Sequence, residues 1–235
     1  MLNEVTEATP ARIYLQPVAA PSILGLYGFA GATFMIAANL AGWYGSDHTA
    51  LYLAPFAFMF GGVAQFLAGM WAFKARDGLA SAMHGMWGAF WIAFGILTYM
   101  FRGTGLPAGA FPELGYWFIV LCAITAVGAW AALAENVSLF LVLLFLALGS
   151  GIEAIARLTG AVGALQIAAG YAFIIASMLA FYTASALMLA ETYGRPVLGL
   201  GKVTKGRQAP VITLGAGEPG VIRGQNLNLA PGQTA

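Results

Sequence analysis

The sequence runs VSLFLVLLFLALGSGIEAIARL from residue 137 to residue 158. An α-helix needs about 20 predominantly apolar residues to cross the hydrocarbon layer of a bilayer, and this stretch has that length. Five further apolar runs of similar length lie in the chain, separated by short polar breaks. The six predicted spans are about Ser22–Trp43, Leu51–Phe73, Leu79–Phe101, Leu114–Ala134, Val137–Leu158 and Val162–Ala190.

The composition excludes a soluble globular domain. Hydrophobic residues make up 60% of the 235 positions and charged residues 8%, and the mean hydropathy is +0.82. Soluble domains carry about 25% charged residues. The net charge of +1 argues against a nucleic-acid partner, because such binding needs clustered Lys and Arg. With two histidines, one cysteine and no catalytic constellation, we expect no metal, no cofactor and no enzymatic activity.

We therefore predict an all-α integral membrane protein, a six-transmembrane-helix bundle with cytoplasmic N and C termini in the inner (plasma) membrane. The orientation follows from the positive-inside rule. Two basic residues, Arg102 and Arg157, fall on the outer side, and eight fall on the inner side: Arg12, Lys74, Arg76, Arg195, Lys202, Lys205, Arg207 and Arg223. The predicted parts are a cytoplasmic segment 1–21, the membrane domain 22–195 and a Gly/Pro-rich cytoplasmic tail 196–235. The first twenty residues lack a basic start and an apolar centre, so they do not predict a signal peptide.

Polar side chains inside the spans are the candidates for function, because burying them away from water is costly. Gln65, Thr33 and Asn39 are the candidate substrate contacts, although a lone amide in a helix bundle more often joins two helices than binds a substrate. Glu153 and Arg157 are four residues apart and therefore share a helical face. Their place near the outer end favours a structural or rim role over a buried proton site.

A group of side chains shares one depth. At about 1.5 Å per residue, Phe29 lies roughly 10 Å from the inner end of its span. Gln65 and Trp87 lie roughly 12 Å, and Leu146 roughly 13 Å, from the inner ends of theirs. Three bulky apolar groups and one amide at one level would suit a hydrophobic constriction beside a polar contact. Glycines are dense in the same spans, which indicates close helix packing and is compatible with a narrow path.

Several stretches resemble the acetate uptake transporter family of bacteria and fungi. The matching stretches keep their order and spacing over residues 20–198. They are Ala20–Phe29 (APSILGLYGF), Phe60–Trp71 (FGGVAQFLAGMW), Trp87–Trp91 (WGAFW), Ala180–Tyr182 (AFY) and Glu191–Leu198 (ETYGRPVL).

The resemblance implies a six-helix protomer with one conduction path, assembled as a homo-hexamer. It implies movement of small carboxylate anions, acetate and also succinate, by proton-coupled transport or channel-like flux. The family's constriction combines an aromatic, a tyrosine and a leucine, which correspond here to Phe29, Trp87 and one of the leucines Leu146 to Leu148. Trp87 thus stands where the family has a tyrosine.

Two other functions remain open from the sequence. One is a non-transporting structural subunit of a larger membrane complex, with the C-terminal tail as a candidate contact to a neighbouring subunit or another protein. The other is a channel for ammonia or another neutral solute, for which an apolar constriction without fixed charge is suited.

Overall fold

The computed structural model describes residues 18–46, 48–102 and 112–201. Within these residues it is all-helical, and six of its helical spans are long and apolar enough to cross a membrane, as predicted. The elements are α1 (Pro21–Leu40), α2 (Thr49–Phe56), η1 (Ala57–Ala64), α3 (Gln65–Ala75), α4 (Gly78–Met100), α5 (Pro112–Ala132), α6 (Val137–Thr159) and α7 (Val162–Tyr193).

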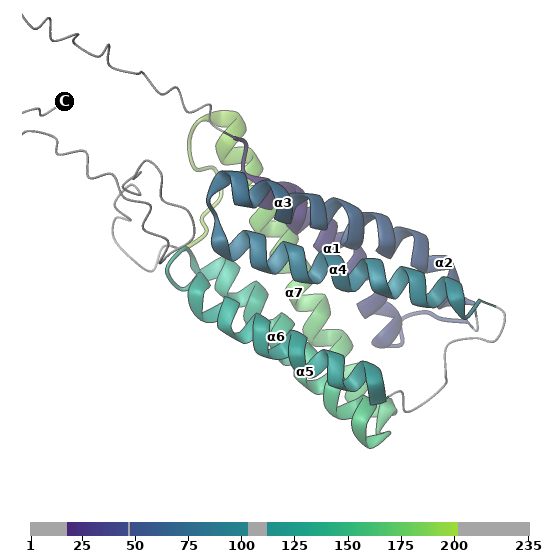
Figure 1. The fold of residues 1–235 in the computed structure, drawn as a ribbon. Coiled ribbons are helices and arrows are strands. Elements are labelled where there is room, and N and C mark those ends of the chain that lie inside the picture. The colour runs from purple at the N-terminus through teal and green to yellow at the C-terminus, as the bar shows by residue number, and fades with distance from the viewer. Residues whose placement is uncertain (1–17, 47, 103–111, 202–235) are drawn as a thin grey trace, which may run out of the picture. The chain divides into compact units, whose positions relative to one another are not determined.

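The six spans, one of which consists of α2, η1 and α3, run antiparallel to their neighbours in the chain and form two groups (Figure 1). One group contains α1, η1, α3 and α4, in which α1 and α4 each pack against η1 and α3 and also contact one another, while the second packs α6 between α5 and α7. Contacts between α1 and α7 join the groups. We call the end where α1 begins and α7 finishes the terminal end, and the other the loop end. The cytoplasmic placement of the terminal end stays a prediction.

The polar breaks end the helices through their own chemistry. The side chains of Asp77 and Asn136 accept hydrogen bonds from the backbone N–H groups of Ala80 (2.9 Å) and Leu139 (2.8 Å), which caps α4 and α6. Gly160 closes α6 with a φ of 72°, a conformation that suits glycine. Local capping therefore fixes the turns at which the chain reverses.

The second span is continuous but not uniformly α-helical. Pro55 lies inside α2 and has no N–H to donate. The next element, η1, is a π-helix of eight residues, and its Gly61 and Gly62 lie against Trp91 and Ile92 of α4. The predicted single α-helix was therefore wrong in this detail. Such π segments often lie at functional sites.

The described beginning of the predicted C-terminal tail packs against α6. The carbonyls of Leu200 and Gly201 accept hydrogen bonds from the N–H groups of Ser138 (3.0 Å) and Val137 (2.7 Å). The Tyr182 hydroxyl donates to the Gly199 carbonyl at 2.7 Å. These carbonyls satisfy N–H groups that a helix start leaves free. Residues 202–235 of the tail, and 1–17 of the N-terminal segment, lie outside the described part.

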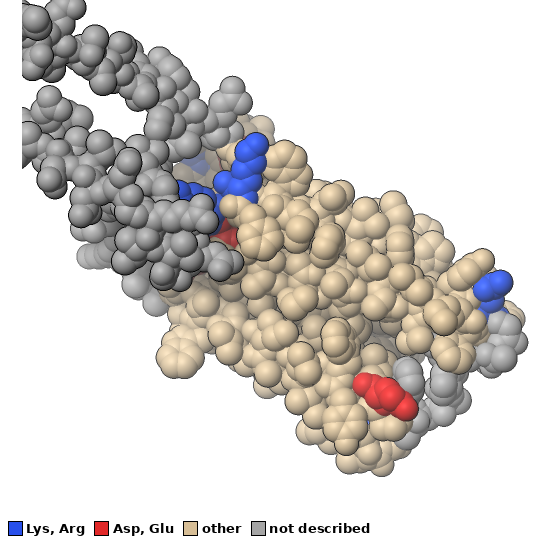
Figure 2. All heavy atoms as spheres, in the orientation of Figure 1, with Lys and Arg blue, Asp and Glu red and all other residues tan. Residues whose placement is uncertain are grey.

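The surface has the polarity of a membrane protein. On the face shown in Figure 2, Lys, Arg, Asp and Glu gather at the two ends, and the described surface between them carries none. Large apolar side chains such as Phe73, Val127 and Trp130 are exposed. Burying such a surface in lipid removes it from water, so the protein is a multi-pass membrane protein.

Close helix contacts depend on glycine where two backbones meet. A Cβ atom on Gly69 of α3 would lie 2.6 Å from the backbone nitrogen of Gly85 on α4. At such a distance the helices must separate, since the obstructing atoms belong to a backbone.

We expect Gly69→Ala to destabilise the fold by about 1–3 kcal/mol or more, because it overpacks the α3–α4 contact. Gly163→Ala is the matched control, since a Cβ there meets nothing within 4 Å. Thermal unfolding in detergent checks the difference. Equal melting temperatures for the two variants would show that the helices are free to move apart.

Candidate functional site

Two cavities lie inside the bundle, one toward each end. The loop-side cavity has a volume of about 170 Å³ and the terminal-side cavity about 30 Å³. The smaller has room for on the order of one or two water molecules, and the larger for a small organic acid. Leu146 lines both cavities, Phe29 lines the terminal-side one and Trp87 the loop-side one. The space between the cavities is thus occupied by the three side chains that share one predicted depth.

These three side chains meet in the centre of the bundle. The exposed fractions of Phe29, Trp87 and Leu146 are 2%, 3% and 2%. The rings of Phe29 and Trp87 contact edge to face, with centroids 6.3 Å apart and planes at 71°. Phe29 comes from α1, Trp87 from α4 and Leu146 from α6, so three different helices close the space.

Trp87 is anchored by a buried hydrogen bond. Its indole Nε1–H donates to the Thr125 hydroxyl of α5 at 3.0 Å. The indole N–H is the only polar group of that side chain, so Trp87 has no second hydrogen bond to donate. The sequence did not identify Thr125 as a site residue, because only the packing of α5 against α4 brings it to Trp87.

Leu148 does not belong to this group. Its side chain is 50% exposed and lines a surface groove between α5 and α6, beside Cys122 and Ile152. Successive residues of an α-helix are about 100° apart, so side chains two positions apart lie on nearly opposite faces. Leu146 is therefore the leucine that faces Phe29 and Trp87.

Gln65 lies at the terminal side of these residues. It follows η1 directly, is buried, and lines the terminal-side cavity with His84. The Gln65 Oε1 atom and the His84 Nδ1 atom have no hydrogen-bond partner in the protein. A half turn of the terminal amide exchanges its oxygen and nitrogen, so Gln65 can present an acceptor or a donor to the cavity. His84 was not among the predicted site residues.

The other two predicted contacts line the loop-side cavity. Thr33 is buried and its hydroxyl oxygen has no partner in the protein. Asn39 lies at the end of α1, and its Nδ2 donates to the Tyr44 carbonyl at 2.7 Å. Asn39 thus also holds the loop after α1.

Unpartnered buried polar atoms concentrate at the cavities. In the described part of the chain there are five such side-chain atoms, and each belongs to a residue that lines one of the two cavities: Thr33 Oγ1, Gln65 Oε1, His84 Nδ1, Trp91 Nε1 and Glu153 Oε2. Leaving a buried donor or acceptor without a hydrogen bond costs about 1–3 kcal/mol. Such atoms are the places where water or a ligand is expected to bind.

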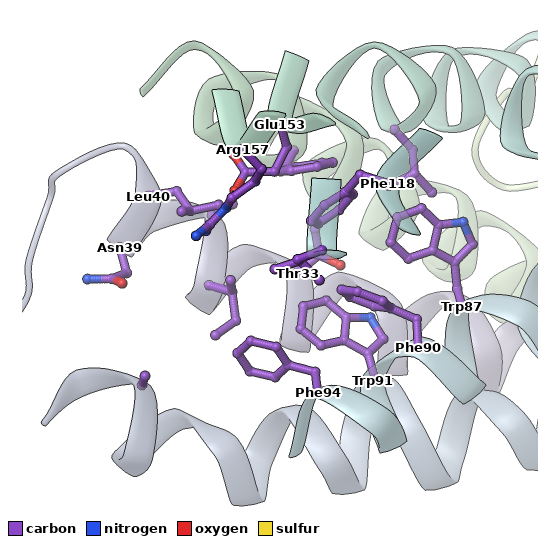
Figure 3. Close-up of a pocket in the computed structure, with 16 residues that line it drawn as sticks. Thr33, Asn39, Leu40, Trp87, Phe90, Trp91, Phe94, Phe118, Glu153 and Arg157 are labelled. Carbon is purple, nitrogen blue, oxygen red and sulfur yellow. The ribbon is translucent and has the colours of Figure 1, made fainter. Parts of the chain in front are cut away.

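Aromatic rings form one wall of the loop-side cavity. Phe90, Trp91 and Phe94 approach it from α4, and Phe118 faces them from α5 (Figure 3). Their neighbouring ring centroids are 5.2–5.7 Å apart for Phe90 with Trp91, Phe90 with Phe118 and Trp91 with Phe94. These packed rings make this wall of the cavity apolar.

Glu153 and Arg157 form an ion pair in the same cavity. Arg157 Nε donates to Glu153 Oε1 at 2.7 Å, and Gln166 Nε2 of α7 lies 3.3 Å from the same oxygen. The sequence predicted that Glu153 and Arg157 share a helical face. It did not predict the burial of Glu153: its side chain is 1% exposed, whereas a position at the rim would leave it accessible.

Within residues 18–46, 48–102 and 112–201, no three His, Cys, Asp or Glu side chains are grouped as metal ligands. What the site offers is an apolar constriction between two small chambers, each with polar atoms that lack protein partners. Such an arrangement can admit a small solute that carries both an apolar part and a polar group.

Known relatives transport small carboxylates. Acetate permease A of Emericella nidulans is 30% identical over 135 residues, 54% of this chain and 45% of that protein, so the chain spans less than half of that relative's length. The succinate-acetate/proton symporter SatP of Escherichia coli K12 is 27% identical over 190 residues, 79% of this chain and 96% of that one. A solved structure of the bacterial acetate channel SatP matches with a TM-score of 0.72 and 25% identity, and covers 79% of this chain and all of that chain.

These relatives are transporters and channels, not enzymes. The similarity confirms the resemblance that the five sequence stretches indicated. The GPR1/FUN34/yaaH family pattern matches residues 5–195. The chain therefore belongs to the GPR1/FUN34/yaaH family.

Proposed function

We propose that this chain moves small carboxylates across the membrane along a path through the single protomer, with acetate as the first substrate and succinate as the larger one. One observation carries the proposal: two cavities from opposite ends meet at Leu146, where Phe29 and Trp87 close the gap. The names of the relatives supply the substrate class, and protons are the proposed co-substrate for the same reason.

The chemistry of a carboxylate explains the layout. A carboxyl group with a pKa of about 4 is ionised at neutral pH, so the path must compensate for its lost hydration. The Gln65 amide on one side of the constriction, and the Thr33 hydroxyl and Trp91 indole N–H on the other, can donate hydrogen bonds to the carboxylate. The methyl or methylene part of the substrate contacts the aromatic wall. Between passages, the apolar constriction excludes water.

Two of the alternative hypotheses can be compared with the structure. The carbonyls of residues 199–201 accept hydrogen bonds from α6 and α7 of the same chain, and a contact between the tail and a partner stays a prediction. A subunit without transport would not need chambers lined by unpartnered polar atoms, and this favours transport over the purely structural role. The homo-hexamer and the orientation in the plasma membrane stay predictions.

The proposal is tested by the Gln65→Leu variant in proteoliposomes. Losing one hydrogen bond to a charged group costs about 1.5–3 kcal/mol, so acetate flux is expected to fall roughly ten- to a hundredfold. Thr98→Val is the matched control, because Thr98 is buried, bonds the Phe94 carbonyl at 2.9 Å and lines neither chamber. Unchanged acetate flux in a folded Gln65→Leu protein would show that the Gln65 amide serves helix packing and does not bind the substrate.

A further inference from the structure

Glu153 is a buried carboxylate with one oxygen unused. Arg157 and Gln166 both bond Oε1, and Oε2 has no partner in the protein. The side chain lines the loop-side cavity with Arg157 beside it (Figure 3). Leaving one carboxylate oxygen without a hydrogen bond does not stabilise a buried ion pair, because a buried charge is most stable when all of its lone pairs accept hydrogen bonds. The residue that carries this unbonded oxygen lines the cavity in which a substrate would bind.

Glu153 and Arg157 are the titratable groups of this cavity among the described residues. On α5, which packs against α6, Glu113 and Tyr116 are exposed, and Cys122 lies against Gly151 on the groove side. On α7, Gln166 bonds Glu153, and Tyr171 is exposed and within hydrogen-bonding distance of Trp43. Protonation inside the cavity therefore concerns the Glu153–Arg157 pair and the substrate.

Charge balance limits what the cavity can hold. Among the described residues that line the empty cavity, one carboxylate and one guanidinium are charged, and their charges cancel. An added carboxylate would leave one net negative charge in an apolar, low-dielectric space, which is strongly unfavourable. An added carboxylate together with one proton leaves the cavity neutral. Neutrality thus links each bound carboxylate to one proton.

We propose that Glu153 is the residue that takes up this proton, which rests on the proposed function above. In the balanced step, the acid's O–H bond breaks and an O–H bond forms at Glu153 Oε2. The electron pair stays on the substrate oxygen, and the proton moves to Glu153. The positive charge of Arg157 then offsets the substrate anion instead of Glu153.

Two further groups fit the product of this step. The Trp91 indole N–H and the Thr33 hydroxyl line the same cavity, are buried and have no partner in the protein. Both can donate a hydrogen bond to a carboxylate oxygen. The cavity therefore contains an acceptor for the proton and donors for the anion that remains.

Calorimetry of acetate binding to the purified full chain counts the protons. Titrations in two buffers of different ionisation enthalpy should give about one proton taken up per acetate bound near pH 7. By linkage, the dissociation constant should rise about tenfold per pH unit between pH 6 and pH 8. Acetate binding without proton uptake by the wild-type chain would overturn the proposal and the coupling to protons, and leave the proposed movement of carboxylates intact. No acetate binding or flux at all would defeat both.

Glu153→Gln keeps the shape of the side chain and removes its proton site. The variant should bind acetate without proton uptake and with a dissociation constant that does not change between pH 6 and pH 8, because Arg157 already offsets the anion. Glu113→Gln is the matched control and should keep the wild-type proton count, since Glu113 is exposed at the start of α5. A Glu153→Gln protein that still takes up one proton would overturn the assignment.

Infrared difference spectra of the wild-type chain show whether the proton lies on Glu153 or on the substrate, even if the Glu153→Gln variant does not fold. Acetate labelled with ¹³C at its carboxyl group should produce a protonated-carboxyl band that shifts in D₂O but is unchanged by the ¹³C label, as expected of a protein side chain. A band that moves with the label would place the proton on the substrate and contradict the role of Glu153.

Discussion

Leu146→Trp is expected to reduce acetate flux to the level of liposomes without protein. Leu146 is the residue common to both cavities, and Phe29 and Trp87 already fill the rest of that level. An indole adds a large ring where a leucine side chain already fills the space between the chambers, so a substrate can no longer displace it and pass. The measurement is uptake of labelled acetate into proteoliposomes with equal amounts of wild type and variant.

Leu148→Trp is the matched control. It makes the same substitution on the same helix, two residues away, but on a half-exposed face that lines a surface groove. This variant should transport at the wild-type rate. Because overpacking at Leu146 can cost about 1–3 kcal/mol, thermal unfolding must show that Leu146→Trp is folded. Full flux in a folded Leu146→Trp protein would mean that solute passes elsewhere.

Trp87→Ala should have two opposite effects. Removing the ring opens and wets the constriction, so acetate flux should rise and larger dicarboxylates such as succinate should pass more readily. Stability should fall by about 3–5 kcal/mol, because a buried aromatic side chain is lost. The Thr125 hydroxyl also loses the indole N–H that bonds it. Paired uptake of acetate and succinate, beside a melting curve, measures both effects.

Trp87→Phe separates the effect of losing the ring from the effect of losing the hydrogen bond to Thr125. It keeps an aromatic ring in the constriction but removes the N–H that bonds Thr125. We expect it to lose about 1–3 kcal/mol for the unmade buried bond and to gain much less flux than Trp87→Ala. If Trp87→Ala is folded and conducts no more than wild type, Trp87 is a packing residue and not part of the constriction.

Most of the fold could be predicted from local sequence. Apolar runs of membrane-spanning length set the six spans, and residues such as Asn136 and Gly160 set their ends. The π-helical turns after Pro55 could not be predicted in the same way. They depend on which carbonyls find donors once α1 and α4 pack against the second span.

The sequence predicted how deep in the membrane the site residues lie, but not which way their side chains point around each helix. Distance along a helix places Phe29, Trp87 and Leu146 at one level, whereas the direction of each side chain depends on tertiary packing. For that reason the sequence could not choose between Leu146 and Leu148, find Thr125 as the partner of Trp87, or show that Glu153 is buried. Each of these features is a contact between helices far apart in the sequence.

The central claim is that the single chain gives small carboxylates a path through the membrane. Its most direct test is the rate of labelled acetate uptake by liposomes containing only this purified protein. Measuring near pH 7.5 keeps little of the acid uncharged, so diffusion through the lipid, read from protein-free liposomes, is small. If the chain forms such a path, uptake should be well above that background, saturable with acetate and reduced by unlabelled succinate. Uptake equal to that of protein-free liposomes, by a protein shown to be folded, would contradict it.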